Sequence, residues 1–193
     1  MSAKLLLVVA SVLILSQARF GGIFKPLVTV PYVNISLYEG EWYEIVRAPA
    51  ADLFEYGCQC NTAIYGLNSN GTVSVNNTCY RNSAWDIVIG YATPVDKTNA
   101  RLKVKFPKAP FAGEYDIIAL GKNYEYAMVG DPSRLFLWIL SRTPTLDKTI
   151  YDELIAGAQK QGFKTTDLIH TVQGNDKCQN YHFGEEEEDV SEE

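Results

Sequence analysis

The sequence has few of the residue types on which most catalytic and metal sites depend. Its 193 residues include two histidines and four cysteines. It shows no glycine-rich phosphate loop, no paired-carboxylate motif and no cluster of metal ligands. We therefore expect no bound metal, no cofactor and no enzymatic activity, and we expect the function to lie in binding.

An excess of positive charge is also missing. The formal net charge is −6, but the 23 acidic residues include seven in the last segment, EEEEDVSEE, which spans residues 185–193. Setting aside this tail and Lys4 leaves 16 acids and 16 bases. A neutral body gives no electrostatic footprint for nucleic acid or an anionic membrane. The tail is typical of a disordered segment, with binding of a cation or basic partner as the alternative.

Long hydrophobic runs are absent except for one at the start of the chain. Eleven apolar or small residues from Leu5 to Leu15 follow Lys4 and precede Ser16-Gln17-Ala18. This pattern predicts a secretory signal peptide over residues 1–18. Eleven helical residues are too short to cross a bilayer core of about 30 Å. No cysteine follows the run to carry a lipid, so we expect a secreted, extracellular protein without stable membrane insertion.

The remaining length fits one domain, residues 19–184, followed by the tail at 185–193. An even number of cysteines in a secreted chain predicts two disulfides, for which three pairings are open. A zinc site at Cys58-x-Cys60 is the alternative, and an oxidising compartment argues against it. Asn-x-Ser/Thr triplets predict glycosylation at Asn34, Asn70 and Asn76.

Short alternating runs rich in β-branched and aromatic residues predict eight strands. They lie near residues 42–48, 59–67, 72–80, 85–93, 101–106, 114–120, 125–130 and 135–142. The pattern then changes to a helical period, with Asp147 as a candidate N-cap and Gly162 at the expected stop. Asn70-Gly71 indicates a tight two-residue hairpin turn.

Eight local antiparallel strands avoid open edges most simply by closing into an up-and-down β-barrel. We therefore predict an all-β fold, an eight-stranded antiparallel barrel with one C-terminal α-helix, whose interior can hold one small ligand. A β-sandwich is the alternative.

Particular residues add a resemblance to a known family. Gly40-Glu41-Trp42 resembles the Gly-x-Trp signature of lipocalins, and the stretch from Leu137 to Arg142 resembles the strand that closes their barrel. Residues 115–146 are similar to the bacterial lipocalin and apolipoprotein D group, and the resemblance covers residues 36–178. One signature departs from the family, because Lys122-Asn123-Tyr124 stands where many members have Thr-Asp-Tyr. The resemblance implies that Trp42 plugs one barrel end, with Arg142 packed over its ring.

The resemblance also implies a disulfide pairing. Related members clip a C-terminal cysteine to an early strand, which implies Cys60 with Cys178 and leaves Cys58 with Cys79. The closed loop of more than a hundred residues is worth up to ~5 kcal/mol in the chain-entropy model.

Cavity residues follow from the same resemblance and from strand alternation. Positions that match the cavity lining of apolipoprotein D-like members are Tyr65, Val75, Asn77, Arg81, Leu102, Val104, Phe106 and Trp138. Alternation alone adds Trp85, Tyr115 and Tyr126. Ordinary core packing is the alternative for each. Arg81 is the candidate for a ligand carboxylate or phosphate, with a solvated rim position as its alternative.

These features predict a secreted carrier for a small hydrophobic or amphipathic ligand, such as a fatty acid, lysophospholipid, sterol or retinoid. A pigment-binding lipocalin that holds a bilin or carotenoid is the first alternative. A lipocalin enzyme acting through a cavity thiol, for which only Cys79 lies near the inward positions, is the second. Neither the ligand nor any protein receptor is named by the sequence.

Overall fold

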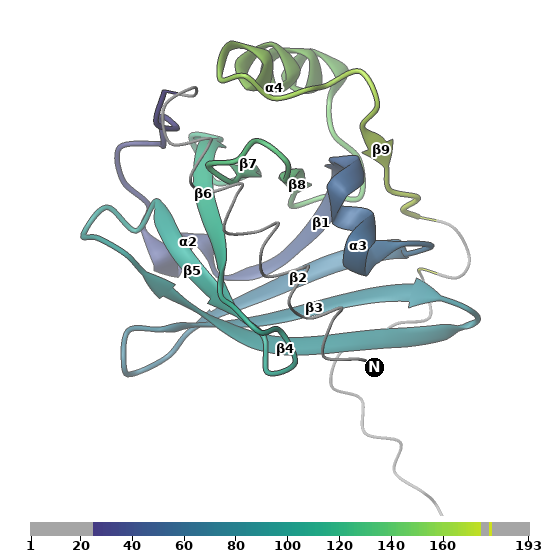
Figure 1. The fold of residues 1–193 in the computed structure, drawn as a ribbon, viewed down its shortest axis with the longest axis horizontal. Coiled ribbons are helices and arrows are strands. Elements are labelled where there is room, and N and C mark those ends of the chain that lie inside the picture. Colours follow the sequence, from purple (N-terminus) through teal and green to yellow (C-terminus); the bar gives the residue numbers. More distant parts are fainter. Residues whose placement is uncertain (1–24, 175–177, 179–193) are drawn as a thin grey trace, which may run out of the picture.

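The fold is known from a computed structural model, which describes residues 25–174 and 178 (Figure 1). The predicted signal peptide at 1–18 and the acidic tail at 185–193 lie outside the described residues. The elements are α2 (Ile35–Tyr38), β1 (Gly40–Arg47), η1 (Pro49–Ala51), α3 (Asp52–Glu55), β2 (Gln59–Leu67), β3 (Val73–Arg81), β4 (Ala84–Pro94), β5 (Arg101–Lys105), β6 (Gly113–Leu120), β7 (Tyr126–Gly130), β8 (Leu137–Ser141), α4 (Lys148–Lys160) and β9 (Ile169–His170).

Strands β1 to β8 form a closed antiparallel barrel. Each strand pairs with its neighbour in sequence, and β1 pairs with both β2 and β8, so the sheet has no open end. The predicted barrel is confirmed, and the sandwich alternative is wrong. All eight predicted strands are present. The sequence did not indicate β9, which extends the sheet beside the second half of β1, where β2 has separated from it.

The two faces of the barrel wall bury different clusters. The inner cluster includes Trp42, Val75, Ile117 and Val129, among other apolar residues. The outer cluster joins one side of the barrel to α4, whose Leu154 and Ala158 are buried. Figure 1 shows α4 lying outside the barrel near β7 and β8. The helix thus covers part of the wall, while the interior stays separate from it.

The predicted helix signals are confirmed. The Asp147 carboxylate accepts hydrogen bonds from the backbone N–H groups of Thr149 and Ile150, at 2.8 and 3.2 Å. Hydrogen bonding from these amides lowers the pKa of Asp147. Gly162 has a φ of +89°, the left-handed conformation expected after a helix end.

The predicted two-residue turn is at a different place. Between β2 and β3, only Gly71 has a positive φ, and the Asn68 N–H donates to the Thr72 carbonyl across a longer loop. The two-residue turn instead joins β3 to β4, where Asn82 and Ser83 have φ values of +51° and +63°. Positive φ angles usually call for glycine, but asparagine and serine adopt them here, so no glycine signal marked the turn.

Candidate ligand-binding site

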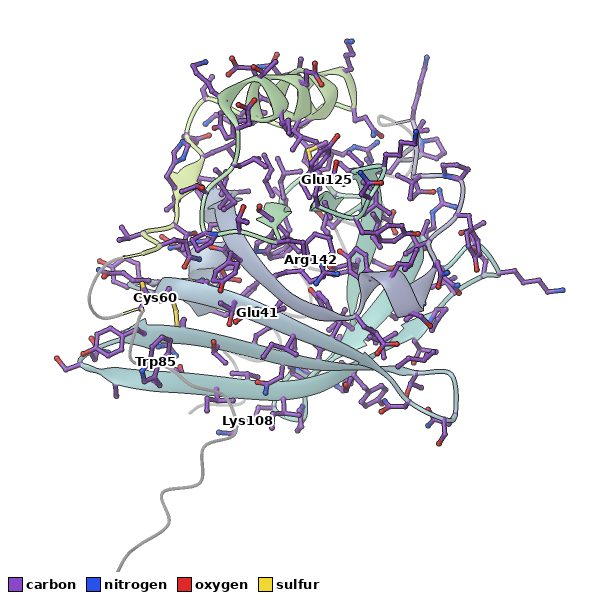
Figure 2. The ribbon with its side chains drawn as sticks, turned by 180° about the vertical axis from the view of Figure 1, so that it is seen from behind. Glu41, Cys60, Trp85, Lys108, Glu125 and Arg142 are labelled. Carbon is purple, nitrogen blue, oxygen red and sulfur yellow. A yellow bond between two sulfur atoms is a disulfide. The ribbon has the colours of Figure 1, made fainter. Side chains whose placement is uncertain are left out.

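One end of the barrel is closed by Trp42 and Arg142. The Arg142 Cζ lies 3.8 Å from the centroid of the fully buried Trp42 ring. The Trp42 indole N–H donates to the Tyr38 carbonyl at 2.8 Å. Figure 2 labels Arg142 near Glu41. The Arg142 guanidinium donates at 2.7–3.2 Å to the backbone carbonyls of Leu37, Glu39, Glu41 and Tyr124. Trp42 therefore forms part of a plug, as the resemblance implied.

The other two signature residues support the same plug. Gly40 has a φ of +91°, and a Cβ there would lie 3.3 Å from the Arg142 guanidinium. The Tyr124 hydroxyl accepts a hydrogen bond from the Asn34 backbone N–H at 2.9 Å. The tyrosine of the altered Lys122-Asn123-Tyr124 signature is thus the member that holds the segment before α2 against the barrel.

A narrow cavity lies inside the barrel next to α2. It is small and partly open to solvent. Apolar and aromatic side chains line it from five strands and α2, namely Ile35, Tyr38, Tyr65, Val73, Ala92, Leu102, Val104, Tyr115 and Ile117. This lining is the composition of a small-molecule site.

Three tyrosine hydroxyls supply the polar groups beside the cavity. The Tyr115 hydroxyl lies 2.9 Å from the Tyr38 hydroxyl and 3.0 Å from the Tyr65 hydroxyl. Burial raises the pKa of Tyr65 to about 12 and also raises the pKa of Tyr38 and Tyr115, so all three stay protonated. Three hydroxyl protons serve two hydrogen bonds within the group. One donor therefore remains for another acceptor.

The structure places most of the predicted ligand residues inside the barrel. Tyr65, Leu102, Val104 and Tyr115 line the cavity. Val75, Phe106 and Trp138 belong to the inner cluster or pack against it. Asn77 lies on the same face of β3 as Val75, and its side-chain oxygen is buried without a hydrogen-bond partner among the described residues.

Two predicted positions are wrong. Tyr126 packs in the outer cluster with α4, because both faces of β7 are covered and its apolar residues do not reveal which face is inside. Trp85 pairs with Tyr80 on β3, and the two rings meet edge to face with centroids 5.5 Å apart. Because Val75 faces inward and side chains alternate, Tyr80 and Trp85 share the outer face.

Arg81 ends β3 at the rim of the barrel, with its side chain 34% exposed, and it already has partners. It forms an ion pair with Asp86 and donates a hydrogen bond to the Phe54 carbonyl at 3.2 Å. Its charge is therefore neutralised before any acidic ligand arrives. This arrangement weakens the case for Arg81 as the group that meets a ligand carboxylate or phosphate.

Several cavity residues were missed by sequence reasoning. Val73, Ala92 and Ile117 each lie two residues from an inward-facing residue, so alternation contained the signal for them. Ile35 and Tyr38 belong to a helix of four residues, which is too short to show a period.

The end of the barrel opposite α2 carries a short lid. Connections between antiparallel strands alternate between barrel ends, so η1 and α3 share this end with residues 82–83, 106–112 and 131–136. The Phe54 ring of the lid stacks near Phe136, and Phe136 stacks on Trp138 at 5.8 Å. The same loops expose large apolar side chains, including Leu53 and Phe111.

Beneath the lid lies a buried ionic cluster that the sequence did not indicate. Arg47 contacts Glu44 at 3.1 Å, Asp52 at 3.0 Å and Glu55 at 3.7 Å. A bulge in β1 between Glu44 and Val46 places both Glu44 and Arg47 on the inner side, although their separation of three residues breaks simple alternation.

Both disulfides join segments near this end. The bridges are Cys58–Cys79 and Cys60–Cys178, the pairing that the resemblance implied. The first ties the residue before β2 to β3, and the second ties β2 to the C-terminal segment. All four cysteines are therefore bridged.

The three candidate glycosylation sites have different surroundings. Asn34 and Asn70 are exposed, and the Asn70 side-chain oxygen accepts hydrogen bonds from Thr72. Asn76 is half-buried and lies opposite Ile89 on the outer face of the wall. The outward position of Asn76 agrees with the inward position of Val75.

Comparison with known proteins agrees with this geometry. Residues 33–173 match the family model of the lipocalin-like domain. The chain belongs to the lipocalin family. Similar relatives of this lipocalin include temperature-induced lipocalin-1 of Arabidopsis thaliana, 33% identical over 78% of this chain and 85% of the relative. The outer membrane lipoprotein Blc of Escherichia coli K12 is 40% identical over 70% of this chain and 77% of the relative.

More distant matches extend the likeness to animal proteins. Apolipoprotein D of Bos taurus is 35% identical over 58% of this chain and 62% of the relative. Among solved structures, insecticyanin of Manduca sexta superposes on this lipocalin with a TM-score of 0.67 at 18% identity, covering 82% of this chain and 90% of that one. Lobster apocrustacyanin A1 gives a TM-score of 0.61 at 20% identity, over 73% and 80%. The two structural matches show the shared fold alone.

Proposed function

We propose that this lipocalin is a secreted carrier that binds a small hydrophobic or amphipathic molecule inside its barrel. The observation that carries the proposal is the apolar and aromatic cavity between the Trp42 plug and the lid. Burying apolar ligand surface there is worth about 25 cal/mol per Å². Secretion is supported by the apolar leader and by two disulfides, which persist in oxidising compartments. Among the described residues, no helix has the length and apolar character needed to cross a bilayer.

The charges inside the barrel bear on the class of ligand. Arg81 is paired with Asp86, Arg47 contacts three carboxyl groups, and Arg142 is occupied by backbone carbonyls and the Trp42 ring. Burying a carboxylate without a cationic partner is costly. The described interior therefore favours neutral or amine-bearing ligands over free fatty acids.

Cavity filling tests the proposal. Ala92→Phe places a ring in the cavity, whereas Thr93→Phe places the same ring on the outer face of the same strand. We expect Ala92→Phe to lower the affinity for a neutral apolar fluorescent probe at least about tenfold, and Thr93→Phe to leave it unchanged. Equal affinity in both variants would contradict binding in this cavity. Mass spectrometry of solvent extracts from the natively secreted protein then identifies the ligand.

The same preparation tests the two alternatives. A pigment lipocalin absorbs visible light beyond the aromatic bands, so an absorbance spectrum of the native protein decides that case. A cavity-thiol enzyme needs a free thiol, and titration of the native protein measures it. We propose that the protein acts by binding without catalysis, and we expect no titratable thiol.

A further inference from the structure

The cluster under the lid has one cation for three carboxyl groups. The side chains of Arg47 and Glu44 are 4% and 7% exposed, that of Glu55 is 18% exposed, and that of Asp52 is 30% exposed. Asp52 faces solvent on one side and Glu55 reaches it with a smaller fraction of its surface, whereas Glu44 is buried. A buried carboxyl group, Glu44, and a mostly covered one, Glu55, thus lie on the inner side of one guanidinium.

Among the described residues, β2, β8 and the segment beside β9 each contribute an uncharged contact to the two carboxyl groups. The Asn61 amide on β2 donates to Glu44 and Glu55 at 3.3 and 3.4 Å. The Trp138 indole on β8 donates to Glu55 at 3.3 Å. The Thr171 hydroxyl, beside β9, donates to Glu44. Among the described side chains that contact the pair, Arg47 is the only charged base.

Protonation of one carboxyl group reduces the excess of negative charge in the pair. Burial, followed by the proximity of Glu44, raises the pKa of Glu55 to about 9. At neutral pH Glu55 therefore carries a hydrogen in the folded protein, and the pair bears one negative charge where two ionised groups would bear two. A proton held this way is exchangeable for another cation that reaches the same oxygens.

A second observation shows that the site also lacks hydrogen-bond donors. The Asn61 side chain is 6% exposed, and its Oδ1 is buried with no donor among the described residues. Its Nδ2 on the same amide donates to both carboxyl groups, so the unpaired acceptor belongs to a residue of the cluster. Leaving a buried acceptor unpaired costs about 1–3 kcal/mol. The site is thus short of both positive charge and N–H groups.

The cluster faces the same barrel interior as the cavity, from the end that carries the lid. Glu44 follows Trp42 by two residues on the inner face of β1, and Trp138, which contacts Glu55, packs against the inner cluster. Tyr65, which lines the cavity, has its pKa raised first by burial and further by the charges of Glu44 and Glu55. A chain that extends from the cavity towards the lid would therefore bring its end to the carboxyl pair.

We propose that Glu44 and Glu55 form a subsite for a primary ammonium group, the head of an amphipathic amine whose apolar chain occupies the cavity. This inference rests on the proposed carrier function and specifies its ligand class. An ammonium supplies one charge and three N–H donors, which are the groups that the pair and Asn61 lack. On binding, Glu55 releases its proton and the ammonium takes its place between the carboxylates.

The test compares dodecylamine, dodecanol and dodecanoate, all below their micellar concentrations, by titration calorimetry at pH 7.5. Two buffers with different ionisation enthalpies report proton release. We expect the wild-type protein to bind the amine at least about tenfold more tightly than the alcohol and to release about one proton. Dodecanoate should bind more weakly than the alcohol.

Glu55→Gln is the informative variant, because glutamine has the shape of a protonated glutamate and cannot lose the proton. We expect its preference for the amine over the alcohol and the proton release to disappear. Glu114→Gln is the matched control, since Glu114 pairs with Lys103 on the exposed outer surface. This variant should keep the full amine preference.

The outcomes separate this inference from the carrier function. If the wild type binds amine and alcohol equally with no proton release, the cluster only anchors the lid and the inference is overturned, while the carrier function stands. If none of the three ligands binds, the proposed function itself fails. The wild-type comparison decides the matter even if Glu55→Gln does not fold.

Discussion

Arg142 holds several separate segments together at the closed end of the barrel, and no local sequence pattern indicates these contacts. Its guanidinium donates to four backbone carbonyls contributed by α2, β1 and the loop before β7, and it stacks on Trp42. A buried carbonyl left without a donor destabilises the folded state by more than one hydrogen bond stabilises it. The plug therefore depends on one side chain, three of whose four carbonyl partners lie more than a hundred residues away in the sequence.

We predict that Arg142→Ala lowers the free energy of unfolding by about 2–4 kcal/mol, because several carbonyls and one face of Trp42 lose their partner. Urea unfolding followed by tryptophan fluorescence measures the change. Lys103→Ala, which breaks an exposed ion pair with Glu114, serves as the control and should change stability by about 0.5 kcal/mol or less. Equal small losses in the two variants would show that Arg142 is dispensable to the plug.

Glu55 gives a prediction about pH. In the folded protein its pKa is raised by burial to about 9, from 4.5 in the absence of these contacts. Between these values the folded state binds more protons at this site than the unfolded chain, so the site contributes less stability as pH rises. Glutamine has no proton to lose. We therefore expect Glu55→Gln to be more stable than the wild type at pH 8 by about 1–3 kcal/mol.

Urea unfolding of both proteins from pH 5 to pH 8 measures this difference. The gap should close as pH falls towards 5, because the wild-type carboxyl is then increasingly protonated in the unfolded state as well. All other titrating groups are common to the two proteins and cancel. A gap that does not change with pH would mean that Glu55 is ionised in the folded state.

Residues differ in how well the sequence locates them. Trp42 and Arg142 were placed correctly because the resemblance supplied the long-range pairing. Tyr126 was not, since α4 buries the outer face of β7 and removes the polar half of the alternation. The ionic cluster escaped notice because a bulge in β1 puts Glu44 and Arg47 on the same side. No particular residue type marks a bulge, so the ionic cluster could not be predicted from the sequence.

At the scale of elements, local sequence patterns predicted the strands and α4 correctly, but they predicted the turns less well. Strand existence follows from alternation and β-branched composition over five or more residues. Turn type depends on two φ angles, which asparagine and serine adopt here without the glycine that usually marks them. The loop with Asn70-Gly71 has the sequence of a tight turn, but its hydrogen bonds close over a longer segment.

The turn between β3 and β4 yields a stabilising variant. Ser83 has a φ of +63°, which is unfavourable for a residue with a Cβ and free of cost for glycine. We predict that Ser83→Gly raises the free energy of unfolding by about 0.5–1 kcal/mol.

Ser69→Gly in the neighbouring hairpin is the control. Ser69 does not have a positive φ, so glycine there only adds freedom to the unfolded chain and should lower stability. Thermal unfolding of both variants distinguishes the signs, and a loss of stability in Ser83→Gly would contradict the assigned turn.

At the scale of the whole molecule, the C-terminal segment is held to the barrel by more than one kind of bond. The Gln173 side chain donates to the backbone carbonyls of Glu44 and Asn61 at 3.0 and 2.7 Å. The Cys60 N–H donates to the Val172 carbonyl at 2.8 Å, beside the bridge to Cys178. This segment thus packs beside the same β1 and β2 residues that surround the proposed ammonium subsite.

The two bridges are expected to stabilise the molecule unequally. Cys60–Cys178 spans 118 residues and Cys58–Cys79 spans 21, so the longer bridge removes more freedom from the unfolded chain. In the chain-entropy model the losses on replacing both cysteines of a bridge with serine are about 5 and about 3 kcal/mol. Urea unfolding of the two double variants under non-reducing conditions measures them, and the wild type in reductant should lose more than either. A larger loss from the short bridge would show that its native contacts, rather than loop closure, determine the contribution of each disulfide.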